Sequence, residues 1–181
     1  MEVKELGHIV LYVRDLEASR GFYRDALGWR EIAGVDHQMA MYSTGRTHHE
    51  LLLIEVGPDA APIPAGRRVG LYHFGLKVGT SDEELREALH TLVNAGANVV
   101  GSADHGVTHS LYISDPDGNE IELYIDVQPE LWRDDPKAVW RRCERCSSRG
   151  SQSGVSARAP EPRPRSCSRR AGPGGSCARR R

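Results

Sequence analysis

One pattern occurs twice in this sequence, and the duplication constrains the fold more than any other feature. Two segments begin alike, GHIVLYVRDLEASRGFYRDALGW from Gly7 and YHFGLKVGTSDEELREALHTLVNAGA from Tyr72. Each opens with a short alternation of apolar and other residues, which is typical of a half-buried strand. A histidine, His8 or His73, stands early in each of these strands. The two segments are therefore predicted to be similar modules.

A helix and three further strands follow in each segment. The helices are expected to start near Asp15 and Ser81, whose side chains can cap a first turn, and to stop at Gly28 and Gly96. The extended pieces are EIAGV, QMAMYST and HELLLIEV, then NVVGSA, HSLYIS and EIELYI. This order predicts an α+β fold in which two βαβββ modules form one curved mixed sheet. The Pro- and Gly-rich linker GPDAAPIPAGRRVG separates the modules, which we expect at about residues 5–57 and 70–127.

The C-terminal segment differs in composition from the rest of the chain. Residues 141–181 contain 12 Arg against two Glu, a net charge of +10, so residues 1–140 carry −11 of the total of −1. From Gln128 onward the strand and helix pattern fails, apart from a short helix at PKAVWRRCERC. The remainder has almost no aliphatic residue and cannot bury enough apolar area to fold. We expect one folded domain at residues 1–132 and a basic, disordered tail at 133–181.

All four cysteines lie in that tail. A zinc site is a minor alternative, because nine residues separate the second pair of Cys143, Cys146, Cys167 and Cys177. Within residues 141–181 no aromatic residue is interleaved with the arginines, so no nucleic acid partner is expected. A cysteine-free domain is what a reducing compartment permits, and neither a signal peptide pattern nor a membrane-spanning apolar run is present. We expect a soluble cytoplasmic protein without a membrane partner.

One carboxylate stands out in HGVTHSLYISDPDGNEIELYID. After the turn DPDGN, alternation places Ile121, Leu123 and Ile125 on one face of a strand and Glu122 on the other. If the first strand of one module lies beside the first strand of the other, His8, His73 and Glu122 can converge on one point. Two His and one carboxylate on one side of a metal are typical of non-haem Fe(II) oxygenases. Each histidine taken separately is as well explained by a satisfied or exposed side chain.

The chain resembles the vicinal oxygen chelate superfamily over about residues 5–132. HGVTHSLYISDPDGNEIE is similar to the signature of its type I extradiol dioxygenases, in which a His, an aliphatic-Tyr pair, a Pro-x-Gly turn and the ligand Glu follow one another. Here these are His105, Leu111-Tyr112, Pro116-x-Gly118 and Glu122. Ala103, two residues before His105, departs mildly from the signature, which usually has Gly, Asn, Thr or an aliphatic residue there. Further matches are RTHHELLLIEV, YHFGLKV and LGHIVLYV. The resemblance is to short forms with a single duplication, including small dihydroxybiphenyl dioxygenases.

This resemblance implies a metal site enclosed by the curved sheet. His8, His73 and Glu122 would hold Fe(2+), with Mn(2+) as the alternative. His49 would act as general acid/base, and Tyr112 and His105 would donate hydrogen bonds to the bound catechol. The implied activity is extradiol (meta) cleavage of a catechol by O2 in aromatic hydrocarbon catabolism, with 2,3-dihydroxybiphenyl as a plausible substrate. We expect a homo-oligomer.

Two other functions remain open at this level. A glyoxalase I-like lyase or isomerase of the same superfamily would use Ni(2+) or Zn(2+) and a fourth ligand near Glu50. Because a one-residue shift changes the face of a strand, either His49 or Glu50 can face the metal, and the flanking leucines do not decide between them. A metal-free binding protein for bleomycin-like drugs is the third reading. Without a catalytic role, His105 would cap a turn and Tyr112 would be a core residue. Surface or helix positions are expected for the remaining histidines, His37, His48, His90 and His109.

Overall fold

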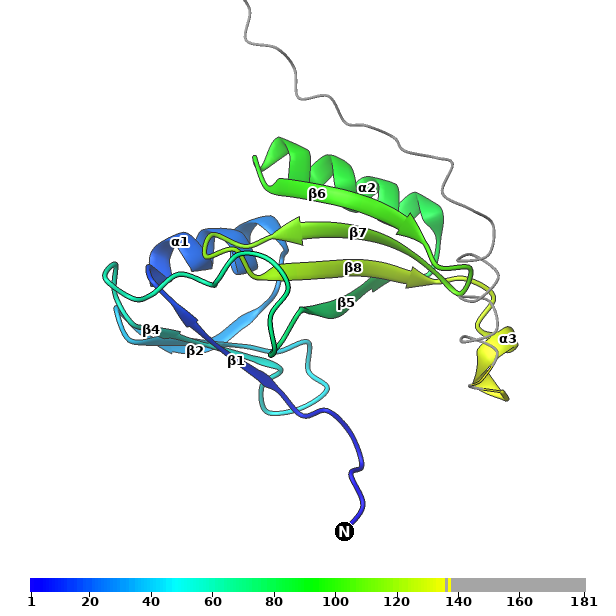
Figure 1. Ribbon diagram of the computed structural model, residues 1–181, viewed down its shortest axis with the longest axis horizontal. Helices are drawn as coiled ribbons and strands as arrows, with labels where there is room; N and C mark the ends of the chain where they lie inside the picture. The colour runs from blue at the N-terminus through cyan, green and yellow to red at the C-terminus, as the bar shows by residue number, and fades with distance from the viewer. Residues whose placement is uncertain (136, 138–181) are drawn as a thin grey trace, which may run out of the picture. The chain divides into compact units, whose positions relative to one another are not determined.

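A computed structural model describes residues 1–135 and 137, all of which belong to one compact unit (Figure 1). The predictions for the tail, namely its disorder, the helix at PKAVWRRCERC and the cysteine site, concern residues outside this range. A short helix that the sequence pattern did not predict, α3 (Glu130–Arg133), ends the described part. Among the described residues, no helix is long and apolar enough to cross a membrane.

The first module follows the predicted order. Its helix begins at Asp15, whose side chain accepts a hydrogen bond from the Ala18 N–H, and continues into a π-helical segment before Gly28 turns the chain with φ of +67°. The positive φ explains the glycine at this stop. The elements are β1 (Ile9–Val13), α1 (Leu16–Arg20), η1 (Gly21–Ala26), β2 (Glu31–Val35), β3 (Met39–Tyr42) and β4 (Leu51–Glu55).

The second module repeats this order with longer elements. Its helix is opened by a capping box, in which Ser81 accepts from the Glu84 N–H while Glu84 accepts from the Ser81 N–H. Gly96, with φ of +71°, ends it. The elements are β5 (His73–Gly79), α2 (Asp82–Asn94), β6 (Asn98–Asp104), β7 (Thr108–Ser114) and β8 (Glu120–Asp126). The α+β class and the two βαβββ modules are thus confirmed.

The eight strands form two mixed sheets of four, rather than the one curved mixed sheet expected. The strand orders are β1-β4-β3-β2 and β5-β8-β7-β6, with parallel pairing of β1 with β4 and of β5 with β8. Within the described residues, the two first strands therefore do not pair with each other. Periodicity predicts which way side chains point in a strand, but not which sheet edges meet. As a result, β1 and β5 are both edge strands.

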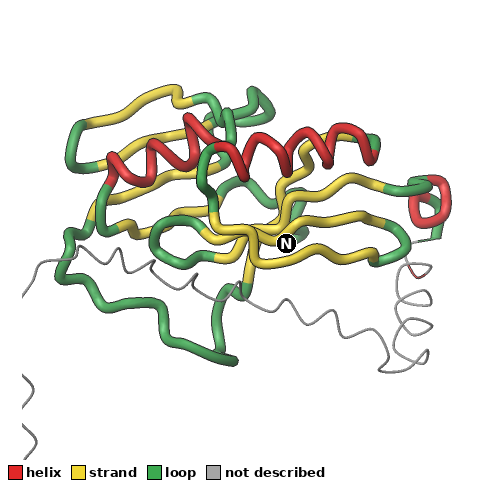
Figure 2. The backbone as a smooth tube through the Cα atoms, turned by 90° about the horizontal axis from the view of Figure 1, so that it is seen from above, coloured by secondary structure: helices red, strands yellow, loops and turns green. Residues whose placement is uncertain are grey.

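Each sheet has one buried face and one open face. Helix α2 lies against all four strands of the second sheet (Figures 1 and 2). The buried faces and helices share one apolar core, whose largest fully buried members include Tyr23, Tyr42, Leu53, Ile113 and Ile121. Phe22 and Tyr23, on the π-helical segment, both belong to this core.

The turn before β8 ties the second module to the first. Tyr23 O–H donates to Asp115 Oδ2 at 2.8 Å, and both side chains are buried. Arg14 N–H donates to Asp117 Oδ2 at 3.1 Å. Asp115 also accepts from the N–H groups of Asp117 and Asn119, which confirms the predicted turn at DPDGN. The turn is therefore anchored just where β8 begins.

Candidate functional site

The open face of the second sheet gathers the polar side chains predicted from β8. Ile121, Leu123 and Ile125 are buried, while Glu122 between them is half-buried, so the predicted alternation is confirmed. Glu122 lies opposite Tyr112 on β7 and opposite Gly75 on β5. Residues opposite each other share a face of the sheet. The carboxylate consequently projects from the middle of the open face.

The two oxygens of the Glu122 carboxylate have different surroundings. Oε1 accepts from Ser110 O–H at 2.6 Å and from Tyr112 O–H at 3.3 Å. Oε2 lies 3.3 Å from Nε2 of His73. Ser110 and Tyr112 thus hold one oxygen in place, and the second oxygen is presented to the imidazole.

Tyr112 is part of a hydrogen-bonded chain on this face. His105 Nε2 lies 2.8 Å from the Tyr112 hydroxyl oxygen and 3.7 Å from Glu122 Oε1. Burial, followed by the charge of Glu122 and the hydrogen bond to it, raises the pKa of Tyr112 to about 12. The phenol therefore stays protonated near neutral pH and can act as a donor. His73, predicted from YHFGLKV, thus lies together with His105, Tyr112 and Glu122, which were predicted from HGVTHSLYISDPDGNEIE.

His73 lies between two carboxylates. Its Nδ1 is 3.5 Å from Oε1 of Glu120, and its Nε2 is 3.3 Å from Oε2 of Glu122. With a proton on Nδ1, the lone pair of Nε2 and the carboxylate of Glu122 point into the same space. One imidazole nitrogen and one carboxylate oxygen are a donor set that suits divalent iron. Two of the three expected ligands therefore fit a metal ion.

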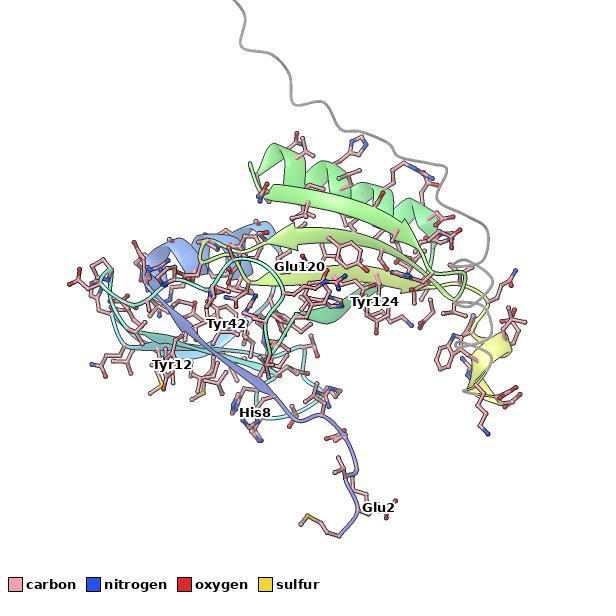
Figure 3. All side chains as sticks on the ribbon, in the orientation of Figure 1. Glu2, His8, Tyr12, Tyr42, Glu120 and Tyr124 are labelled. Atoms are coloured by element: carbon pink, nitrogen blue, oxygen red, sulfur yellow. The ribbon has the colours of Figure 1, made fainter. Side chains whose placement is uncertain are left out.

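The third expected ligand, His8, lies in a different cluster. Its ring centroid is 4.5 Å from that of His49 and 6.0 Å from that of His48. Figure 3 shows His8 at the start of β1, well separated from Glu120 on β8. In residues 1–135 and 137, no three His, Cys, Asp or Glu side chains are arranged to hold a metal ion. The described part of one chain thus brings together His73 and Glu122, but not His8.

His49 and Glu50 take different roles in the first module. Glu50 Oε1 accepts from Thr44 O–H at 2.7 Å, and Oε2 accepts from Thr44 N–H at 2.8 Å. Its side chain is 11% exposed and also lies 3.6 Å from Nε of Arg46. Burial, then the neighbouring histidines His48 and His8, lowers the pKa of His49. Both oxygens of Glu50 are occupied, and His49 is the neighbour of His8.

The strand register identifies the counterpart of Glu122 in the first module. Glu122 pairs with Gly75, two residues after His73, and Leu52 pairs with Val10, two residues after His8. Leu52 therefore occupies the position equivalent to Glu122. Glu50, near which the sequence placed a fourth ligand, precedes this position by two residues; the register of β1 against β4 could not be read from the sequence.

Three residues at this site were missed at the sequence level. Ser110 holds Glu122, Glu120 faces His73, and Gly75 leaves space beside Glu122 and Tyr124. A Cβ at position 75 would lie 3.1 Å from Tyr124 Cε1 and 3.8 Å from Glu122 Oε2. Alternation in HSLYIS and EIELYI places Ser110 and Glu120 on the face of Glu122, so this signal was present. Their contacts depend on the pairing of β5, β7 and β8.

A cleft of about 610 Å³ lies between the two modules. Its walls include His8 and Glu50 from the first module, Gly75 and Lys77 from the second, and the apolar side chains Leu27, Trp29, Leu51, Phe74 and Leu123. This volume is in the range of small-molecule sites, and a mostly apolar lining suits an aromatic ring.

Comparisons with known proteins agree on the fold and divide on the chemistry. The sequence profile of the Glyoxalase/Bleomycin resistance protein/Dioxygenase superfamily matches residues 5–123. Catechol-2,3-dioxygenase of Bacillus subtilis (strain 168) is 36% identical over 134 residues, covering 74% of this chain and 46% of that protein. Biphenyl-2,3-diol 1,2-dioxygenase 3 of Rhodococcus globerulus is 34% identical over 123 residues, covering 67% and 63%. The chain thus spans about half to two thirds of the length of these relatives.

A solved structure adds a relative with different chemistry. The crystal structure of lactoylglutathione lyase from Agrobacterium tumefaciens superposes with a TM-score of 0.54 at 28% identity, covering 68% of this chain and 95% of that one. The fold is therefore common to proteins named for ring cleavage and for lyase activity, so the choice between these reactions depends on the residues of the site.

Proposed function

The chain belongs to the glyoxalase/bleomycin resistance protein/dioxygenase superfamily, and we propose that within it the protein is an Fe(II)-dependent extradiol dioxygenase that cleaves a catechol. The observation that carries this proposal is the pair formed by His73 Nε2 and Glu122 Oε2, 3.3 Å apart, beside the hydrogen-bonded chain of His105 and Tyr112. The sequence similarity to two catechol-cleaving enzymes supports the same reaction.

Each side chain of the site has a role in this reaction. His73, Glu122 and His8 would hold the iron, which when bound would supply the Lewis acidity and the redox chemistry for O2. Tyr112 would donate a hydrogen bond to a catechol oxygen, with His105 holding the phenol in place. His49, whose pKa is lowered by burial, is neutral near pH 7 and can accept the proton of a catechol hydroxyl. The ring bond beside the diol is cleaved, and both oxygen atoms of O2 enter the product.

The edge strands suggest how His8 joins the other two ligands. Because β1 and β5 each pair with one strand only in the described residues, each has a free edge that can accept another strand. If β1 of one copy lies along β5 of a second copy, His8 comes beside His73 of that copy. We therefore propose a homo-oligomer in which each site takes His8 from one subunit and His73 and Glu122 from another.

A glyoxalase-like lyase is the alternative, favoured by the similarity to lactoylglutathione lyase. That reading required a fourth ligand from the last strand of the first module. The equivalent position is Leu52, which has no ligand atom, and both oxygens of Glu50 are occupied by Thr44. These contacts favour the three-ligand site and the dioxygenase.

Ring cleavage is tested by anaerobic reconstitution of the full chain with Fe(II), followed by catechol or 2,3-dihydroxybiphenyl in air. We expect O2 uptake with formation of a yellow ring-opened product. Inactivity on both catechols, with turnover of the methylglyoxal–glutathione hemithioacetal under Ni(II), would instead establish the lyase.

The shared site is tested by mixing two inactive variants, His8→Ala and Glu122→Ala, under conditions that allow subunits to exchange. If the ligands come from different copies, one site in each mixed pair keeps all its ligands, and activity should return. If one chain supplies all three ligands, every site carries a substitution and the mixture should stay inactive.

A further inference from the structure

The contact between His73 and Glu120 has no part in the reaction as described above. We propose that Glu120 is a positioning residue that holds the His73 ring with Nε2 directed at the position beside Glu122, and thereby sets the affinity of the metal site. This inference rests on the iron site proposed above. It assigns no contact with the substrate to Glu120.

The two side chains face each other across neighbouring strands. His73 and Glu120 are partners in the register of β5 and β8, so both project from the open face. His73 Nδ1 and Glu120 Oε1 are 3.5 Å apart, and both atoms are buried without a hydrogen-bond partner in the described part of the chain. A buried polar group left without a partner destabilises the fold. A shift of a few tenths of an ångström would form one hydrogen bond between them and satisfy both atoms.

This hydrogen bond would determine which nitrogen faces Glu122. With Nδ1–H donated to Glu120, Nε2 is left with its lone pair, 3.3 Å from Glu122 Oε2. Two acceptor atoms at this distance repel each other unless a cation lies between them. A carboxylate on the far nitrogen of a metal-bound histidine fixes the ring and makes it a better ligand. Glu120 and Glu122 thus have complementary tasks on the same ring.

Glu120 is itself held by Tyr72. The hydrogen bond from the Tyr72 hydroxyl to Glu120, followed by the carboxylate charge, raises the pKa of Tyr72. The Tyr72 ring lies 4.7 Å from the His73 ring, which it flanks at an angle of 59°. The tyrosine therefore supports both members of the pair, which is the arrangement expected of a preorganised ligand.

The first module provides an internal comparison. Glu50 precedes Leu52 by two residues, as Glu120 precedes Glu122, so the two glutamates occupy equivalent positions. The carboxylate of Glu50 is occupied by Thr44. The arrangement at Glu120 is consequently specific to the module that carries the ligand Glu122.

The test measures Fe(II) affinity under anaerobic conditions, by competition with a chromophoric chelator. Glu120→Ala should weaken Fe(II) binding about 10–100-fold. Glu120→Gln should weaken it less, because its amide oxygen still accepts a hydrogen bond. Asp126→Asn is the matched control: it removes the same charge from the same face of β8, where Asp126 pairs with Lys77 at 2.5 Å, and should bind as the unaltered chain does.

Fe(II) binding by the His73 and Glu120 variants distinguishes failure of the positioning role from failure of the iron site. If His73→Ala loses Fe(II) while Glu120→Ala binds as tightly as Asp126→Asn, the iron site stands and the positioning role is overturned. If the unaltered chain binds no Fe(II), or His73→Ala binds it equally well, both fail.

At saturating iron, the KM for catechol of Glu120→Ala should match that of Asp126→Asn. A raised KM with unchanged Fe(II) affinity would mean substrate contact and would overturn the inference. Should circular dichroism show that the alanine variant is unfolded, Glu120→Gln decides: weaker binding than Asp126→Asn supports the role, and equal binding refutes it.

Discussion

Replacing Tyr23 by phenylalanine removes one hydroxyl and with it a buried link between the modules. The hydroxyl donates to Asp115 at 2.8 Å, Tyr23 is fully buried, and Asp115 is 5% exposed. Burial, followed by the charge of Asp115, raises the pKa of Tyr23 well above its usual value, so the phenol is a hydrogen-bond donor at neutral pH. The substitution therefore breaks a hydrogen bond between a neutral donor and a buried carboxylate.

The size of the effect follows from what remains around Asp115. A hydrogen bond to a charged group contributes about 1.5–3 kcal/mol. After the substitution the carboxylate still accepts from Asp117 N–H at 3.0 Å, from Asn119 N–H at 2.7 Å and from the Asn119 side-chain amide at 2.9 Å. Because three donors remain, we expect the lower half of that range, about 2 kcal/mol of unfolding free energy.

Urea unfolding measures this loss. With a slope of about 2 kcal/mol per molar urea, the midpoint should fall by about 1 M. Tyr12→Phe is the control, because Tyr12 is 71% exposed and its loss should change the stability by less than about 0.5 kcal/mol. A Tyr23→Phe midpoint equal to that of Tyr12→Phe would refute the reasoning. A double-mutant cycle with Asp115→Asn should give a coupling of about 0.5–3 kcal/mol.

Three further substitutions probe other parts of the molecule. Gly75→Ala should keep the fold but raise the KM for catechol, because the added methyl group would lie 3.1 Å from Tyr124 Cε1. Gly101→Ala is the control: its Cβ meets no described atom within 4 Å, so the KM should stay unchanged. His49→Ala should keep Fe(II) but lose about 10²–10⁴-fold in kcat, and loss of iron instead would show that the ligand set is wrong. Burial raises the pKa of Tyr42 to about 12. The folded chain therefore keeps a proton that the unfolded chain releases above pH 10. As a result, the free energy of unfolding should fall between pH 10 and 12. Tyr42→Phe should flatten that fall in urea titrations, with no loss at pH 7, because the buried hydroxyl has no partner in the described residues.

The parts of the fold that depend on local chemistry could be predicted from sequence. Alternation along EIELYI predicts the inward face of Ile121 and the open face of Glu122, because successive side chains of a strand point to opposite faces. Ser81 and Gly96 mark the ends of α2, since a helix needs an acceptor at its start and a positive φ after its end. These signals are contained within a few residues of sequence, and the structure confirms them.

The parts that depend on contacts between distant segments could not be predicted. His8 and His73 are equivalent in the two modules, yet no local signal states whether β1 and β5 meet within one chain or between two. Sequence placed a fourth ligand of a glyoxalase-like site near Glu50, and only the pairing of β1 with β4 shows that Leu52 holds the position equivalent to Glu122. Alternation predicts a face, but the register between strands decides which residues become neighbours.

The two open faces are equivalent in backbone and different in chemistry, and this difference bears on how a catechol would bind. The first module's open face is largely apolar, with Val10 44% and Tyr12 71% exposed and Leu52 half-buried beside them. The second module's open face carries the polar cluster around Glu122. An apolar surface of this kind commonly marks a ligand or partner contact. A site built from one face of each kind would place the ring of an aromatic diol against the first module and its hydroxyls against the second. Introducing a charge on the first face away from His8, by Tyr12→Glu, should therefore weaken catechol binding while leaving the His73–Glu122 pair and its Fe(II) affinity in place.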